Sequence, residues 1–263
     1  EKQKHEKKMP VRIIPIGGVE EIGRNMTVVE YGDEIIVMDA GIQFPEEETP
    51  GIDFIIPNTA YLEKNKNRIK GLIISHGHLD HVGAIPYLID RLGFPTIYTT
   101  RLTKALVLKR QEEFPHTPRL KIEEVDSSKS LVFGQMKVRF FDITHTIPDA
   151  IGTIIETPHG NVIYPGDFKV ELGSDGKPMD VEQFIELGKE KNLILLLEST
   201  KAETPGFSVP EKVAHKNLEK IIVESKGRVI IGMFSSLIER VIEMVRIAEK
   251  YDKKVVLDGY SLK

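Results

Sequence analysis

One short stretch constrains this chain more than any other, and it reads LIISHGHLDHVGA from Leu72 to Ala84. Its apolar start, Leu72 to Ile74, predicts a buried strand. Directly after that strand come four side chains of the kinds that bind metals in proteins: His76, His78, Asp80 and His81. A surface loop has no need of three imidazoles beside a carboxylate, so this crowding predicts a metal site.

The spacing of these side chains indicates two groups. Alternate residues of an extended segment point the same way, so His76 and His78 are expected to face one point. Asp80 and His81 fall near the N-terminus of a helix that we predict for residues 82–92, where they are placed to face a second point. One loop is therefore expected to serve two metal ions.

The composition limits how a metal can be held and where the protein works. The chain has 263 residues, no cysteine and a net charge of -4, so any metal must be bound by imidazole and carboxylate groups. The absence of cysteine, of a long apolar run and of a signal peptide predicts a soluble protein of the cytoplasm, with no membrane segment. The charge argues weakly against a polyanionic partner, but two divalent ions would reverse the local field.

The remaining pattern predicts a layered α/β protein. Apolar, β-branched runs predict strands at Val11–Ile16, Met26–Tyr31, Glu34–Met38, 96–98, 136–143, 152–157 and 161–164. The glycines of Gly17-Gly18 and of Asp39-Ala40-Gly41 have two interpretations, either tight turns or backbone that passes close to the metal loop.

The pattern HxHxDH after an apolar strand resembles the signature of the metallo-β-lactamase superfamily, whose members are mostly dinuclear metallohydrolases. The segment GGVEEIGRNM resembles the GGxxEIGxN motif of its bacterial ribonuclease J family. This resemblance implies a four-layer αββα fold. It also implies that Asp39 braces the metal loop by hydrogen bonding without binding metal.

Two more ligands are implied by the same resemblance, because THTIPDA and YPGDFK are similar to the family's THSIPDS and TGDFK segments. His145 would join His76 and His78 on the first metal. An isolated histidine there would more often be a core residue, but the ordered set of candidate ligands favours metal binding. Asp167 would bridge to a second metal held by Asp80, His81 and a further family ligand that is expected to follow Lys263. Imidazole ligands favour zinc, and the mixed nitrogen and oxygen set also admits manganese.

A further carboxylate follows the apolar run Leu193–Leu197, which we predict to be a strand buried on both faces. The LLLEST pattern there resembles the first additional motif of the β-CASP nucleases, a branch of the superfamily that acts on RNA or DNA. The resemblance implies a catalytic role for Glu198 beside Asp80. The family usually has Asp at the first position and Asn where this chain has Lys201.

From residue 208 the pattern alternates helices, at 211–226 and 236–250, with strands at 228–233 and 254–258. Such alternation predicts a parallel sheet. The domains are then a charged tail (1–8), a metallo-β-lactamase domain (9–207) and the beginning of an α/β β-CASP domain (208–263).

The segment GMFSSLIER within that last domain resembles the family's TFASNIxR. The backbone of Ser235 and Ser236 would bind a phosphate at a helix N-terminus, and Arg240 would add a charged contact. Arg240 could equally be an ordinary surface residue.

The function that the resemblance implies is hydrolysis of phosphodiester bonds in single-stranded RNA by a two-metal nuclease. Such an enzyme would act as a 5′–3′ exonuclease or an endonuclease in rRNA processing and mRNA decay, as a homo-oligomer. Two alternatives remain: a small-molecule hydrolase of the same fold, such as a thioesterase or lactonase, and a non-catalytic RNA-binding or assembly subunit. The family's later motifs would follow Lys263, so the chain alone is expected to be impaired.

Overall fold

The computed structural model describes residues 9–45, 49–173, 176–179, 181–207, 209–234 and 236–259. The predicted tail 1–8 and the phosphate-site residue Ser235 lie outside these ranges. The chain divides into two compact units. The first comprises Glu1–Ile143, Asp149–Phe168 and Glu182–Glu198, and the second comprises Thr144–Pro148, Lys169–Val181 and Ser199–Lys263.

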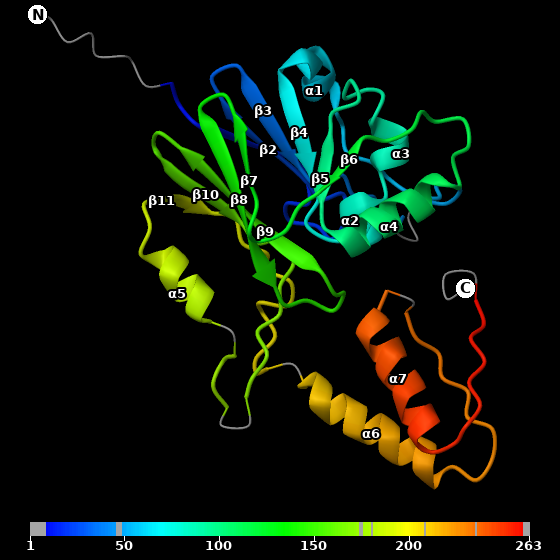
Figure 1. Cartoon of the computed structure of the whole chain (residues 1–263). Helices are drawn as coiled ribbons and strands as arrows, with labels where there is room; N and C mark the ends of the chain where they lie inside the picture. Colours follow the sequence, from blue (N-terminus) through cyan, green and yellow to red (C-terminus); the bar gives the residue numbers. More distant parts are fainter. Residues whose placement is uncertain are drawn as a thin grey trace, which may run out of the picture. The chain divides into compact units, whose positions relative to one another are not determined.

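The first unit contains two mixed β-sheets (Figure 1). One has the order β1-β2-β3-β4-β5-β6, antiparallel from β1 to β3 and parallel from β3 to β6. Its strands are β1 (Arg12–Gly17), β2 (Met26–Tyr31), β3 (Glu34–Met38), β4 (Ile69–Ile73), β5 (Ile97–Thr99) and β6 (Ile122–Glu124). The metal loop follows β4, at the carboxyl end of the parallel part.

The second sheet has the order β11-β10-β9-β8-β7, with all neighbours antiparallel except the parallel pair β10 and β11. Its strands are β7 (Ser130–Phe133), β8 (Met136–Ile143), β9 (Ala150–Thr157), β10 (Gly160–Tyr164) and β11 (Asn192–Leu195).

Strand β3 shows why the two sheets stack. Ile36 and Met38 contribute to a buried cluster shared with Val138, Ile155 and other residues of the second sheet. Ile35 and Val37 point the opposite way, into a cluster with residues of the helices that cover the first sheet. Successive side chains of a strand alternate between its faces, and burying each such side chain stabilises the fold by about 1.5–3 kcal/mol.

Helices cover both outer faces of the stacked sheets (Figure 1). On the first sheet lie α1 (Ala60–Lys64), α2 (Leu79–Val82), α3 (Ile85–Leu88) and α4 (Arg101–Gln111), with a 3₁₀ turn at Lys66–Arg68. On the second, Leu187 of α5 (Glu182–Gly188) packs against Phe141 and Ile163. The four-layer αββα fold is therefore confirmed.

Several predicted elements were right and some were wrong. The strands predicted at 26–31, 34–38 and 136–143 form with those bounds. The single helix predicted at 82–92 is instead two short helices, α2 and α3. Pro86 lies in the first turn of α3, and because it has no backbone N–H it cannot continue a hydrogen-bond ladder from α2.

The prediction that Leu193–Leu197 is buried on both faces is also wrong. β11 is an edge strand paired with β10, and Leu193 and Leu195 are 48% and 53% exposed. An apolar run without alternation fits burial only where layers lie on both sides of the strand, and no described element covers it here.

The second unit contains two helices, α6 (Glu211–Glu224) and α7 (Ile238–Lys250). Arg240 bonds to Glu211 at their first turns and Lys250 bonds to Glu219 near their last, so the helices run parallel. The strands predicted at 228–233 and 254–258 do not form, and Ile230 and Val256 are 88% and 87% exposed. A strand needs a hydrogen-bonded neighbour, which no described residue of this unit supplies.

Within the described residues, none of the helices combines the length and the apolar character needed to cross a bilayer.

Gly41 decides between the two interpretations of the glycines. A Cβ on Gly41 would lie 1.5 Å from the Asp80 carbonyl oxygen, so this backbone does pass against the metal loop. Gly17 and Gly18 instead lie against Arg24 and Asn25, where a Cβ would meet oxygens at 2.3 and 2.5 Å.

Gly41→Ala is therefore expected to push the metal loop away and to lower the free energy of unfolding by about 1–3 kcal/mol. Urea unfolding measures the change. The matched control is Gly188→Ala, because nothing lies within 4 Å of the added Cβ there. Equal stability of the two variants would contradict the predicted clash.

Candidate metal centre

The carboxylate of Asp39 organises the loop that carries the predicted metal ligands. Asp39 directly follows β3 in a left-handed conformation (φ 61°) and its side chain is fully buried. The backbone N–H of Ser75 donates to it at 2.8 Å, the Ser75 hydroxyl at 2.9 Å and the Tyr164 hydroxyl at 2.6 Å. The Nδ1 of His81 lies 2.8 Å away. One buried charge thus joins β3, β10 and the loop after β4.

These bonds also set which histidine nitrogens are available. An imidazole nitrogen that faces a buried carboxylate carries a proton, so His81 Nδ1 donates to Asp39, and Nε2 is the nitrogen that can bind a metal once its own proton is displaced. The Ser75 hydroxyl donates to Asp39, so its oxygen can accept from His76 Nδ1, 3.0 Å away. The Nε2 of His76 is then also able to bind a metal ion.

The predicted ligands of the first unit form two adjoining groups. In the first, Nε2 of His76 lies 3.0 Å from Nδ1 of His78. In the second, Nε2 of His81 lies 3.5 Å from an oxygen of Asp80. In tetrahedral zinc sites with bonds of 2.0–2.1 Å, neighbouring donor atoms are about 3.4 Å apart. The chemistry and spacing of these donors therefore suit a metal ion in each group.

Asp167, shortly after β10, faces both groups. Its Oδ1 lies 3.3 Å from His81 Nε2, and its Oδ2 lies 4.0 Å from His76 Nε2. A donor atom of Asp167 lies within 4.8 Å of those of His76 and His78, and one lies equally close to those of Asp80 and His81. One carboxylate, with one oxygen toward each group, has the arrangement that a bridging ligand requires.

The pKa values follow from these contacts. Burial alone would lower the pKa of His81, but the charge of Asp39 and hydrogen bonds to Asp167, Asp39 and Asp80 raise it well above its usual value. Burial would raise the pKa of Asp80, and the hydrogen bond and charge of His81 lower it. Burial and Asp39 both raise the pKa of Tyr164, which stays protonated as a donor.

The other predicted ligand, His145, follows the end of β8 by two residues, at a strand end as expected. Its segment, Thr144–Pro148, belongs to the second unit. Its predicted place on the first metal stays a prediction.

Glu198 has a specific contact in the first unit. The backbone N–H of Phe168 donates to its Oε1 at 2.9 Å, directly after Asp167 in the chain. The carboxylate therefore holds the segment that carries Asp167. Its predicted catalytic role stays a prediction.

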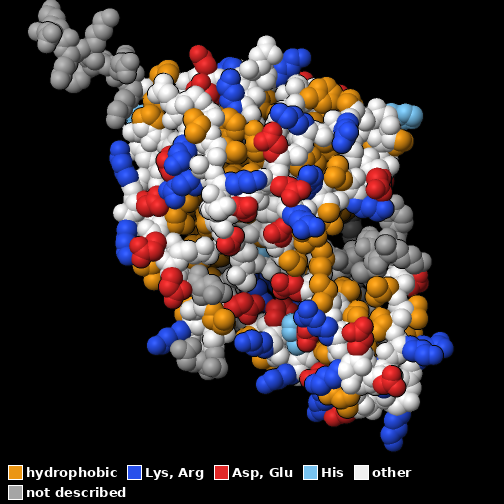
Figure 2. Space-filling view, in the orientation of Figure 1, with side chains coloured by type: hydrophobic (Ala, Val, Ile, Leu, Met, Phe, Trp, Pro, Cys, Tyr) orange, Lys and Arg blue, Asp and Glu red, His pale blue; other side chains and the backbone are white. Residues whose placement is uncertain are grey.

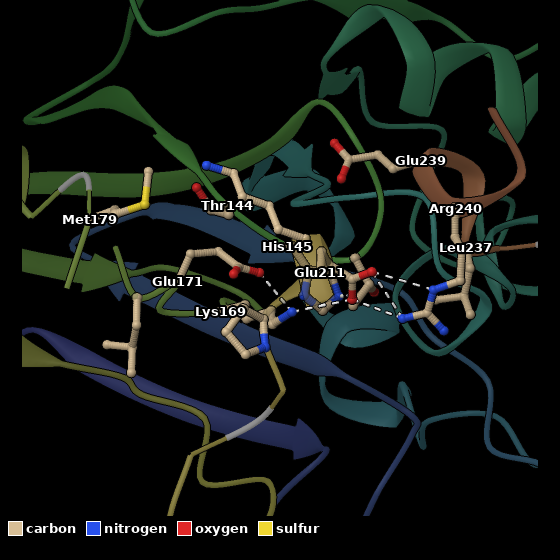
Figure 3. Close-up of a pocket in the computed structure, with 13 residues that line it drawn as sticks. Thr144, His145, Lys169, Glu171, Met179, Glu211, Leu237, Glu239 and Arg240 are labelled. Atoms are coloured by element: carbon tan, nitrogen blue, oxygen red, sulfur yellow. Dashed lines mark hydrogen bonds and ion pairs between the residues drawn. The ribbon is translucent and has the colours of Figure 1, made fainter. Parts of the chain in front are cut away.

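Of the predicted phosphate contacts, Arg240 lines a pocket of about 190 Å³ in the second unit (Figure 3). Arg240 donates two hydrogen bonds to Glu211, at 2.8 and 3.0 Å, and Lys169 contacts the same carboxylate at 3.3 Å. Arg240 is thus engaged in an ion pair at the first turn of α6. Ser236 is exposed.

Charges of both signs are interspersed over the face that Figure 2 shows. The composition, 36 basic and 40 acidic residues, agrees with this mixture. Recognition of an anionic substrate would then depend on the local field of the site rather than on bulk charge.

Three residues of the site were missed by sequence reasoning: Ser75, Tyr164 and Asn25. Ser75 adjoins the HxHxDH motif, and Tyr164 precedes the segment PGD, but neither residue type is a usual metal ligand. Asn25 ends the GGVEEIGRN segment, and its side chain reaches the backbone and carboxylate of Asp80. Their common signal is position beside a motif rather than chemistry.

Comparisons with known proteins agree with this geometry. A protein-family model described as the metallo-beta-lactamase superfamily matches residues 19–195. A crystal structure of a protein of unknown function from Enterococcus faecalis superposes with a TM-score of 0.67 at 18% identity, over 95% of this chain and 70% of that one. At that identity the likeness concerns the fold alone.

Curated relatives are more similar in sequence. The chain is 41% identical to ribonuclease J 1 of Streptococcus pyogenes over 96% of its length, and 39% identical to ribonuclease J of Mycoplasma pneumoniae over 97%. It is 35% identical to ribonuclease J 2 of Staphylococcus aureus over 97%. It spans 45%, 45% and 46% of those three proteins.

The family model covers more than half of the chain, and the αββα layers and the His/Asp cluster agree with it. The chain therefore belongs to the metallo-beta-lactamase superfamily.

Proposed function

We propose that this chain carries the dinuclear metal centre of a ribonuclease that hydrolyses phosphodiester bonds of single-stranded RNA. The observation that carries the proposal is the position of Asp167, with one oxygen toward His76 and the other toward His81. The ribonuclease J names of the relatives support RNA as the substrate. Because the chain spans less than half of those relatives, the proposal concerns the complete product of its gene.

The proposed ligands are His76, His78 and His145 for one ion, Asp80 and His81 for the other, and Asp167 for both. Three imidazoles on one ion favour zinc over manganese. Bound divalent ions would supply Lewis acidity and a nucleophile at neutral pH.

The chain's own residues would do the rest. Asp80 has a lowered pKa, so it is a carboxylate at neutral pH and would orient or deprotonate the nucleophile. Asp39 keeps the His81 proton on Nδ1, through the 2.8 Å contact, and so fixes the orientation of its Nε2. Glu198 holds the backbone beside Asp167. From the family resemblance we also propose that the protein is cytoplasmic and that it forms a homo-oligomer.

His76→Ala is expected to abolish stoichiometric metal binding to the first group, because a buried ligand is lost from a loop that supplies two of its donors. Metal content after purification without added metal measures this. His116→Ala is the matched control, since His116 is exposed in a loop away from the site residues in sequence. Unchanged content in His76→Ala would contradict the assignment.

Metal affinity is expected to fall as the pH falls. The raised pKa of His81 keeps its second proton on the metal-free imidazole above pH 6.5, and a metal must displace that proton from Nε2. Below the raised pKa the affinity should therefore increase with pH, by up to about tenfold per unit for one proton. Calorimetry in buffers of different ionisation enthalpy counts the protons released. Binding that released no proton at neutral pH would contradict this.

The complete gene product is expected to cleave a 5′-monophosphorylated single-stranded RNA only when metal is present, and Asp80→Ala should reduce the rate by at least about 100-fold. The assay compares both proteins on that RNA and on a thioester. Cleavage of the thioester but not of RNA would contradict the proposed ribonuclease activity and favour a small-molecule hydrolase. RNA binding without cleavage of either substrate would favour a non-catalytic role.

A further inference from the structure

The segment from Gly18 to Asn25 joins β1 to β2. Glu21 closes it, because the Gly18 N–H donates to Glu21 Oε1 at 3.0 Å and Arg24 forms an ion pair with the same carboxylate. Gly18 and Gly23 have φ values of 82° and 97°, which favour glycine. The result is a compact loop that returns to pair Gly17 with Met26.

The end of this loop is bonded to the metal loop through the backbone. The Asn25 N–H donates to the Asp80 carbonyl at 3.1 Å, and the Gly41 N–H donates to the Asn25 carbonyl at 3.0 Å. The Arg24 N–H donates to the Ile42 carbonyl at 3.0 Å. Three segments distant in sequence therefore interlock at Asn25, Gly41 and Asp80.

The side chain of Asn25 continues this contact into the site. Its Nδ2 lies 3.1 Å from the Asp80 carbonyl, 3.4 Å from Asp80 Oδ2 and 3.1 Å from His81 Nε2. On the other side of the amide, a Cβ on Gly18 would lie 2.5 Å from Asn25 Oδ1. Gly18 therefore leaves the space that this amide occupies.

We propose that Asn25 is a positioning residue for the second metal ion, acting through the backbone carbonyl and the carboxylate of Asp80. The proposal rests on the proposed dinuclear centre. The amide is a neutral donor, so it can hold the Asp80 carboxylate without adding charge or competing as a ligand. Residues that orient metal ligands typically change metal affinity by 10–100-fold when removed.

The contacts also explain why the effect should be selective. Asn25 reaches the pair Asp80 and His81, whereas the backbone turn that carries His76 and His78 is held by Asp39 through Ser75. Loss of the amide should therefore weaken the binding of one ion and leave the binding of the other unchanged.

The test is titration of the metal-free complete gene product with Co²⁺, followed by visible absorption. Asn25→Ala removes the amide, and Asn25→Leu removes it while keeping similar volume. Both are expected to bind the second equivalent 10–100-fold more weakly, with an altered absorption band, and the first within about threefold of wild type. Asn67→Ala, at an exposed asparagine, is the matched control.

Three results would overturn the inference in distinguishable ways. Wild-type affinity for both equivalents in Asn25→Leu would show that only the volume of residue 25 matters. Equal weakening of both equivalents would show general damage to the fold. A wild-type complete gene product that took up fewer than two equivalents at saturating Co²⁺ would overturn the proposed dinuclear centre itself.

Discussion

The buried carboxylate of Asp39 is the interaction on which this structure most depends. It accepts hydrogen bonds from Ser75 and from Tyr164, and it contacts His81 at 2.8 Å. An isolated buried charge would be costly, so these donors are required wherever Asp39 is ionised. Tyr164 belongs to the second sheet and Asp39 directly follows a strand of the first. The polar site and the apolar core between the sheets are therefore stabilised by the same stacking.

This arrangement explains how loops on a sandwich can hold ligands accurately. The loop after β4 is hydrogen-bonded to Asp39 and Asn25 and packs closely against the backbone of Gly41. Each contact uses backbone or a short side chain, so little conformational freedom remains in the ligand positions. Sites built on such rigid supports keep the geometry that catalysis needs.

Apolar, β-branched runs predicted β2, β3 and β8, and the crowded histidines predicted the ligand loop, because these signals are local. The four-layer arrangement was implied by the resemblance to the superfamily. What the sequence did not predict depends on neighbours distant in sequence. Exposure of the apolar run in β11 depends on which layer covers it, and the runs at 228–233 and 254–258 lack strand partners among the described residues. Asn25 was missed as a site residue although it ends the GGVEEIGRN motif, because only the fold brings its amide to Asp80.

The contact between Glu198 and the Phe168 N–H links Asp167 to the edge of the second sheet. Glu198 follows β11, which pairs on one side only and exposes Leu193 and Leu195. Edge strands with few buried contacts open locally at lower free energy than central strands, and their amides exchange hydrogen faster. Order at Asp167 is therefore coupled to the local unfolding of this strand. A partner that covered β11 would slow hydrogen exchange at the Phe168 amide and reduce the motion of Asp167 without contacting either residue.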